Sequence, residues 1–150
     1  MAFPRLLSLP PHVIGLGYLL AYVALDWISY VHPFGPFGIT PWNPSTGMSF
    51  VLALLFGLRH LPLLFLAPVL ADVLVRGLPA GFVGLLGSLV IGAGYSAAAL
   101  VLLRPVPHFD VSLSSTRDLF LLLLVAVVSS AAVALVYVAI HVFAGFFPWS

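Results

Sequence analysis

The sequence predicts an all-α integral membrane protein, a polytopic helical bundle of about five transmembrane helices. Hydrophobic residues make up 63% of the 150-residue chain and charged residues only 6%, and the mean hydropathy is +1.23. So few charges cannot cover the surface of a water-soluble domain, and an exposed apolar surface would aggregate. The apolar runs are long enough for helices that cross a bilayer. No alternating ten-residue pattern of a β-barrel is present.

The composition excludes several functions. The basic residues are five arginines with no lysine, which is too little for a nucleic-acid-binding patch. Without cysteine the chain has no disulfide, thiolate metal site or thiol nucleophile. No GxSxG, HExxH, Walker or GxGxxG motif occurs in a credible context, so we expect no catalysis within these residues. The sequence identifies no cofactor.

The chain opens with an apolar run that we interpret as a retained first helix, His12 to Tyr30. It is not typical of a cleaved signal peptide, because Pro10 and Pro11 interrupt its start and no small-x-small cleavage site follows. Two short apolar segments come next, Met48 to Leu58 and Leu61 to Val75. They fit either two tilted short spans or one re-entrant hairpin, and the sequence leaves both open.

Two longer segments complete the predicted bundle, Gly81 to Leu103 and Leu119 to Phe143. Ser114 or Ser115 precedes the last one and is expected to cap it near Asp118. Small residues recur every three or four positions in the fourth span, a pattern that lets membrane helices approach closely. We therefore expect a helix-packing face, although glycine is also common in membrane helices without such a role. The predicted packing residues are Gly84, Gly87, Ser88, Gly92 and Ser96.

The arginines predict the orientation. With the N-terminus in the cytoplasm, four of the five arginines fall inside and only Arg76 falls outside. The positive-inside rule therefore favours a multi-pass protein with its N-terminus in the cytoplasm, five crossings and the C-terminus outside. Aromatic residues then gather at the outer interface: Trp27, Tyr30, Trp42, Phe146, Phe147 and Trp149.

Ionisable residues inside a membrane are costly and are candidates for a functional site. Asp26 and Asp72 both fall near the outer ends of their spans, and Arg76 follows Asp72 by one helical turn. We interpret these groups as parts of a polar pocket that opens outward. The alternative is that the acids only cap or pair near the interface, where a charge costs less. The candidate ligand-binding residues are Asp26, Asp72, Arg76, Tyr137, His141, Trp42 and Asn43.

Histidines beside these acids raise the question of a metal. Asp26, Asp72, His32 and His141 include suitable ligand types, but their spacing does not indicate a metal site and we predict none. His60 and His108 are expected to be solvated on the cytoplasmic side.

The stretch "GITPWNPSTGMSF" separates the first two spans. Pro41 and Pro44 disfavour helix in the connection, and Trp42 suits an interfacial anchor. We expect Ser45 or Thr46 to cap the second helix and the whole stretch to cover the outward pocket.

This region also resembles a known family. "TPWNPSTGMSFVLALLFGLRHLPLLFLAPVLADVLVRG" is similar to the signature of the first MASE type of bacterial membrane-associated sensor domain, with Trp42, Pro44 and Gly47 followed by Gly57, Arg59 and Pro62. "STRDLFLLLLVAVVSSAAVALVYV" resembles the later helix of the family, and the resemblance covers roughly residues 13 to 147. The family is usually built on about eight helices, whereas five spans are visible here.

The resemblance implies an N-terminal sensory module of a histidine kinase or a cyclic-di-GMP enzyme in a bacterial inner membrane. On that basis we expect one transmembrane domain, the N-terminal part of a longer signal-transduction protein, that perceives a ligand or membrane partner and acts on a cytoplasmic output domain. Besides the lipid bilayer, we expect a membrane-protein partner or a homodimer and no nucleic acid. Two alternatives remain open: a small subunit for transport or substrate capture, and a structural accessory subunit of a larger membrane complex.

Overall fold

The computed structural model describes residues 9–30, 43–77, 81–104 and 109–145, and the account of the structure is confined to them. Helices dominate these residues and no strand occurs among them, which confirms the all-α prediction. The elements are α2 (Pro11–Tyr30), α3 (Pro44–Phe56), a short 3-10 turn η2 (Leu58–His60), α4 (Leu61–Arg76), α5 (Phe82–Leu103) and α6 (Thr116–Phe143).

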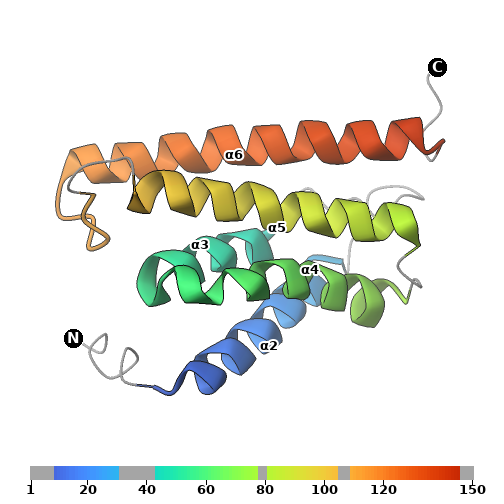
Figure 1. Cartoon of the computed structure of the whole chain (residues 1–150), viewed down its shortest axis with the longest axis horizontal. Coiled ribbons are helices and arrows are strands. Elements are labelled where there is room, and N and C mark those ends of the chain that lie inside the picture. Colours follow the sequence, from blue (N-terminus) through green and yellow to red (C-terminus); the bar gives the residue numbers. More distant parts are fainter. Residues whose placement is uncertain (1–8, 31–42, 78–80, 105–108, 146–150) are drawn as a thin grey trace.

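The helices form a bundle in which neighbours in sequence are neighbours in space. α5 packs against α6 on one side and against α4 on the other, while α2 packs against both α3 and α4 (Figure 1). Successive helices run in opposite directions, so α2, α4 and α6 end at one end of the bundle, where α5 begins. At the opposite end α3 turns into α4 and α5 leads into α6. We call the end where α2 finishes the α2-exit end, and the end where α3 turns into α4 the α3–α4 turn end.

Among the described residues, four segments are long and apolar enough to cross a membrane: Pro11–Tyr30, Leu58–Val75, Phe82–Leu103 and Thr116–Phe143. The third predicted segment is therefore longer than expected, because η2 runs directly into α4 without a break. The second predicted segment remains short. The 13 residues of α3 measure about 20 Å, which is less than the ~30 Å hydrocarbon core of a bilayer.

The start of α3 differs from the prediction. The helix begins at Pro44, four residues before Met48, because proline suits the first position of a helix, where no backbone donor is needed. Ser45 and Thr46 therefore lie inside the helix and do not cap it. Their hydroxyls instead donate to Asn43, which is the N-cap residue: Ser45 to its side-chain Oδ1, and Thr46 to its backbone oxygen at 2.9 Å.

The start of α6 confirms the predicted serine cap. The Oγ of Ser115 accepts a hydrogen bond from the backbone nitrogen of Asp118 at 3.1 Å, and it donates to the Asp118 carboxylate at 2.7 Å. A turn held by Asp110 precedes the cap. Hydrogen bonds from Ser112 first, and then from Ser114, lower the pKa of the exposed Asp110 carboxyl to about 2, so the turn keeps a charged acceptor at any physiological pH.

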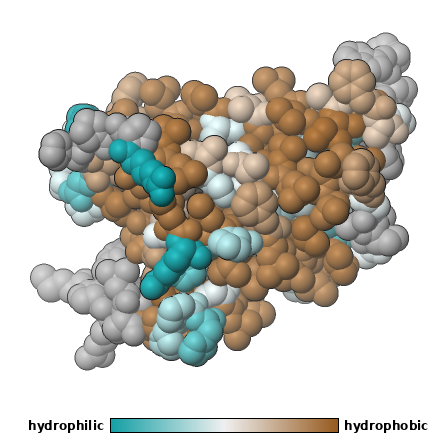
Figure 2. Space-filling model, viewed as in Figure 1, coloured by the Kyte–Doolittle hydropathy of each residue, from teal (hydrophilic) through white to brown (hydrophobic). Residues whose placement is uncertain are grey.

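Large hydrophobic side chains cover the outside of the bundle. In Figure 2 they occupy most of the visible face, and hydrophilic groups gather toward the α3–α4 turn end. Helix α6 contributes the most extensive apolar surface, because its membrane-crossing stretch is not buried within the chain. Such an exterior suits lipid as solvent and confirms the membrane character of the chain.

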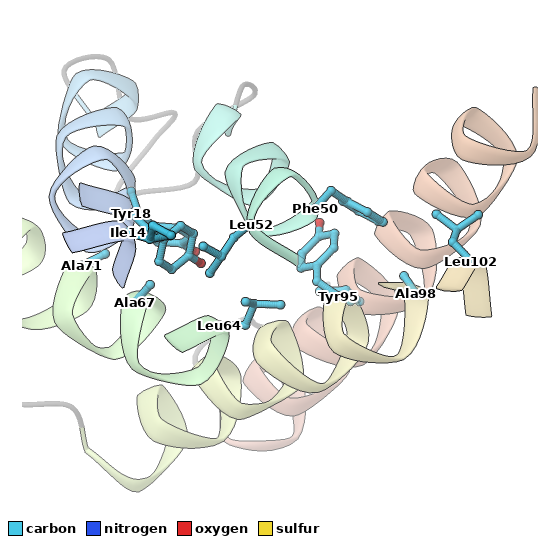
Figure 3. Packing of buried hydrophobic residues seen from close by; sticks show 12 residues of the cluster. Ile14, Tyr18, Phe50, Leu52, Leu64, Ala67, Ala71, Tyr95, Ala98 and Leu102 are labelled. Atoms are coloured by element: carbon cyan, nitrogen blue, oxygen red, sulfur yellow. The ribbon is translucent and has the colours of Figure 1, made fainter. Parts of the chain in front are cut away.

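The interior is built from aromatic and small residues. Tyr18 packs against Tyr22 with ring centroids 5.8 Å apart, and Phe50 meets Tyr95 edge to face at 5.4 Å. Figure 3 shows how Leu64 and Ala67 of α4 fill the space between these two aromatic groups. The core thus joins α2 to α5 through α3 and α4.

The arginines lie at the two ends of the bundle in the same groups that the sequence analysis assigned to the two sides of the membrane. Arg59, Arg104 and Arg117 all lie exposed at the α3–α4 turn end, whereas α4 ends with Arg76 at the other end. His60, at the first of these ends, is buried and not solvated as expected, because its Nδ1 lies 3.2 Å from the backbone oxygen of Phe56 and its ring packs against the Phe56 ring.

The orientation can be tested with single cysteines, since the chain has none of its own. Ser112→Cys and Gly81→Cys place a thiol at opposite, exposed ends of the bundle. Because the arginine-rich end belongs in the cytoplasm, an impermeant maleimide should label Gly81→Cys in spheroplasts and Ser112→Cys only in inverted vesicles. The reverse pattern would refute the predicted orientation, and labelling of both in spheroplasts would show that the two ends do not lie on opposite sides.

Candidate functional site

A hydrogen bond between a serine hydroxyl and an aspartate carboxylate connects α4 to α5. Ser88 of α5 is 1% exposed, and its Oγ donates to Oδ2 of the half-buried Asp72 on α4 at 2.9 Å. A hydrogen bond to a charged group in a low-dielectric interior is stronger than one between neutral groups. This contact fixes the α2-exit end of α4 against the first turns of α5.

The residue before Ser88 receives side chains of α6. A Cβ atom at Gly87 would lie only 2.7 Å from Cε2 of Tyr137 and 3.4 Å from Cε1 of His141. The two rings stack with centroids 4.2 Å apart and planes inclined by 26°. The His141 Nδ1 lies 2.8 Å from the Tyr137 carbonyl oxygen, and because that oxygen only accepts, Nδ1 carries the proton. Glycine at position 87 is therefore what lets α6 approach.

Three helices thus meet at two consecutive residues of α5. We call this group of Asp72, Gly87, Ser88, Tyr137 and His141 the polar junction. It connects α4 to α5 by a hydrogen bond and α5 to α6 by a close ring contact. A shift of one helix must change the contact that holds the next.

A second group of polar side chains lies between α2 and α3. Tyr18, Tyr22, Asp26 and Ser29 occupy one buried face of α2, and Asp26 is 4% exposed. The Tyr18 hydroxyl and the Ser49 Oγ are 3.0 Å apart. Because the two helices are antiparallel, the next turn of α2 at Tyr22 matches the preceding turn of α3 at Ser45. We call Tyr18, Tyr22, Ser45 and Ser49 the α2–α3 seam. Asp26 and Ser29 follow on the same buried face of α2.

The predicted site residues lie on several helices. The structure places Asp72, Tyr137 and His141 at the polar junction, and Asp26 on the buried face of α2. Asn43 lies exposed at the start of α3, where it bonds Ser45 and Thr46. Trp42, His32 and the side chain of Arg76 lie outside the described residues, and so does most of the stretch that was expected to cover a pocket.

The predicted packing face of α5 is partly buried against two helices. A Cβ at Gly92 would lie 2.6 Å from Cδ1 of Phe65 on α4, and Ser96 is buried near the middle of α5. Gly84 is half-buried in the first turn. Gly94, which the sequence did not single out, receives Val133 of α6 in the same manner as Gly87 receives Tyr137.

Sequence reasoning missed the hydroxyl groups of the core. Ser88 was assigned only to packing, and Tyr18 and Ser49 were not considered at all. A signal was present in the sequence: tyrosine, tyrosine and aspartate recur every four residues along α2, which places them on one helical face. A polar face on a membrane helix must be buried against protein.

Both polar groups are parts of packed helix contacts. The described part of the chain has two surface grooves. Leu16 and Val75 are among the residues that line the first, and Leu9 and Phe56 among those that line the second. Both linings are mainly apolar, and neither includes Asp26 or Asp72. Among the described residues, no three of His, Asp or Glu come together so that they could hold a metal ion. The arrangement suits the coupling of helices more than the enclosure of a large ligand.

Comparisons of the chain with protein-family models, with curated proteins and with solved structures give no match. The geometry of the polar groups is therefore what bears on function.

Two serines on α5 provide a matched pair for testing the polar junction. Ser88→Ala removes the donor to Asp72 and should lower the free energy of unfolding by about 1.5–3 kcal/mol, the usual contribution of a hydrogen bond to a charged group. The buried Ser96 Oγ has no hydrogen-bond partner among the described residues, so Ser96→Ala should cost little or stabilise. Reversible unfolding in detergent measures both. Equal effects would contradict the assigned role of Ser88.

Gly87 can be tested in the same way against a glycine that faces open space. Gly87→Leu should lower the thermal midpoint in detergent, because overpacking costs about 1–3 kcal/mol and the Tyr137 ring blocks the new side chain. A Cβ atom at Gly17 would have no atom within 4 Å, so Gly17→Leu serves as the control and should leave the midpoint unchanged or raise it. An unaltered midpoint for Gly87→Leu would show that α6 does not pack there.

Proposed function

We propose that the chain is a membrane-embedded sensory module that transmits a stimulus from the outer side of a bacterial inner membrane to a cytoplasmic output domain such as a histidine kinase. The polar junction carries this proposal. Asp72, Ser88, Gly87 and Tyr137 form an unbroken set of contacts from α4 through α5 to α6. A stimulus that displaces α4 changes the position of α6 through these contacts, which is what a signalling bundle requires.

The packing of the core supports sensing over transport. Asp26, Asp72 and His141 lie toward the α2-exit end. The other end also has buried polar groups, His60 and Asp118, and there Leu52, Leu64 and Leu102 are packed at 3%, 1% and 0% exposure. A conduction path needs polar groups or water through the whole membrane. The two grooves in the described part of the chain are lined mainly by apolar side chains and offer no such path.

The topology that accompanies this proposal has five crossings, with the N-terminus in the cytoplasm and α3 as a short, tilted crossing. A chain that leaves the membrane on the outer side after α6 needs an odd number of further spans before a cytoplasmic domain. The resemblance to the first MASE type, whose members carry more helices than the five seen here, supports this extension.

The proposal is tested first by reading the gene beyond Ser150. A kinase or cyclic-di-GMP domain after further spans supports it, whereas a gene that ends there beside an ATPase subunit favours a transport subunit. If the chain can be recovered only within a large membrane assembly, it is an accessory subunit.

Variants at Asp72 of the polar junction and at Arg76, one helical turn later, then test the mechanism in the full-length protein. Asp72→Asn keeps the shape of the side chain but removes its charge, and Arg76→Gln removes the cation one turn later. Both should change the output several-fold, read as kinase phosphorylation or cellular cyclic-di-GMP, while membrane insertion remains normal. Ser96→Ala is the control and should signal like the wild type. Wild-type output from both Asp72→Asn and Arg76→Gln would refute the proposed coupling.

A further inference from the structure

An apolar groove runs along the outside of the bundle between α2 and α4. One face of α2 forms its first wall, at positions spaced by three and four residues from Leu16 through Leu20 and Val23 to Trp27. Leu70, Leu74 and Val75 of α4 form the second wall. This face of α2 is distinct from the buried face that carries Tyr18, Tyr22 and Asp26. The groove has a volume of about 470 Å³.

The groove lies where lipid is the surrounding solvent. Leu16, Leu20 and Trp27 are 61%, 63% and 64% exposed, and Leu74 is 66% exposed, so the walls open to the outside of the bundle. All lining side chains are aliphatic except Trp27. With no charge or hydrogen-bonding pair along its length, the groove selects an occupant that is a hydrocarbon chain.

The dimensions of the groove match one leaflet of a bilayer. From Leu16 to Trp27 the helix rises by about 16 Å, and one leaflet of the hydrocarbon core is about 15 Å thick. Trp27 lies at the end of the groove near the end of α2, at the level where indole rings are enriched beside lipid headgroups. The groove reaches Leu16, five residues after α2 begins, so an acyl chain that starts at this level and fills the groove extends past the middle of the helix.

We propose that the groove between α2 and α4 binds one acyl chain of a phospholipid from the leaflet in which α2 ends, the outer leaflet in the predicted orientation. Two walls contact the chain where a single helix surface would offer one, so dispersion contacts hold this lipid more firmly than the surrounding lipids. The inference stands independently of the sensory role.

Native mass spectrometry can detect the lipid after reconstitution into vesicles of phosphatidylethanolamine and phosphatidylglycerol and extraction into detergent. We expect one phospholipid retained per chain. Ala24→Phe fills the groove and should abolish this retention, because Ala24 lines the wall. Ile28→Phe is the matched control: Ile28 is 55% exposed on α2 but does not line the groove, so its lipid should remain.

A fluorescence experiment avoids any change to the groove. With Trp42→Phe and Trp149→Phe, Trp27 is the sole indole, and phospholipids brominated along the acyl chain quench it on contact. A lipid bound at one site exchanges slowly with the bilayer. The quenching of Trp27 should therefore lag behind the addition of brominated lipid. Quenching that follows the bulk fraction of brominated lipid, equal retention by all variants, or no retained lipid would each overturn the proposal. So would a dimer that Ala24→Phe dissociates, since a second copy would then fill the groove.

Discussion

The bundle depends on one constraint: in a bilayer the lipid is as apolar as the helices, so no hydrophobic force drives the helices together. Close approach and polar contacts must hold them instead. Each main interface of α5 shows this. Gly92 admits Phe65 of α4, Gly94 admits Val133 of α6, and Gly87 admits Tyr137. The Asp72–Ser88 hydrogen bond is a directional polar contact in the interface between α4 and α5.

The same constraint explains why the interior is more polar than the exterior. A hydroxyl or carboxylate that faced lipid would lose its hydrogen bonds with no water to replace them. Tyr18 and Ser49 are accordingly buried between α2 and α3, and Asp26 is buried on the same face of α2, while most leucines and valines of α6 face outward. The polar groups that hold the bundle are therefore also the groups able to respond when a helix moves. Structure and proposed function rest on the same few side chains.

Much of the fold could be predicted because it follows from length and hydropathy. Four apolar segments long enough to cross a membrane and the serine cap of α6 are local properties of the sequence. The start of α3 was wrong because Pro44 was interpreted as a helix breaker, although proline is also favoured at the first helical position. The prediction that His60 is solvated was also wrong. Its burial depends on how η2 joins α3 to α4, which its neighbours in sequence do not determine.

The candidate site was predictable in its members more than in its arrangement. Intramembrane acids and their positions along the helices identified Asp26 and Asp72, but not the hydrogen bond from Ser88 to Asp72. That contact depends on which face of α4 meets α5. Such pairings arise from packing of all the helices together, and the spacing of residues within one helix does not determine them.

A double-mutant cycle tests the central claim most directly, namely that α4 and α6 are coupled through α5. Asp72→Asn and Tyr137→Leu change the two outer members of the polar junction, and the unfolding free energies of both single variants and of the double variant are measured in detergent. Coupling predicts an interaction energy of at least about 0.5 kcal/mol between the two positions. Effects that add within about 0.3 kcal/mol would show that the two helices respond independently and would contradict the account.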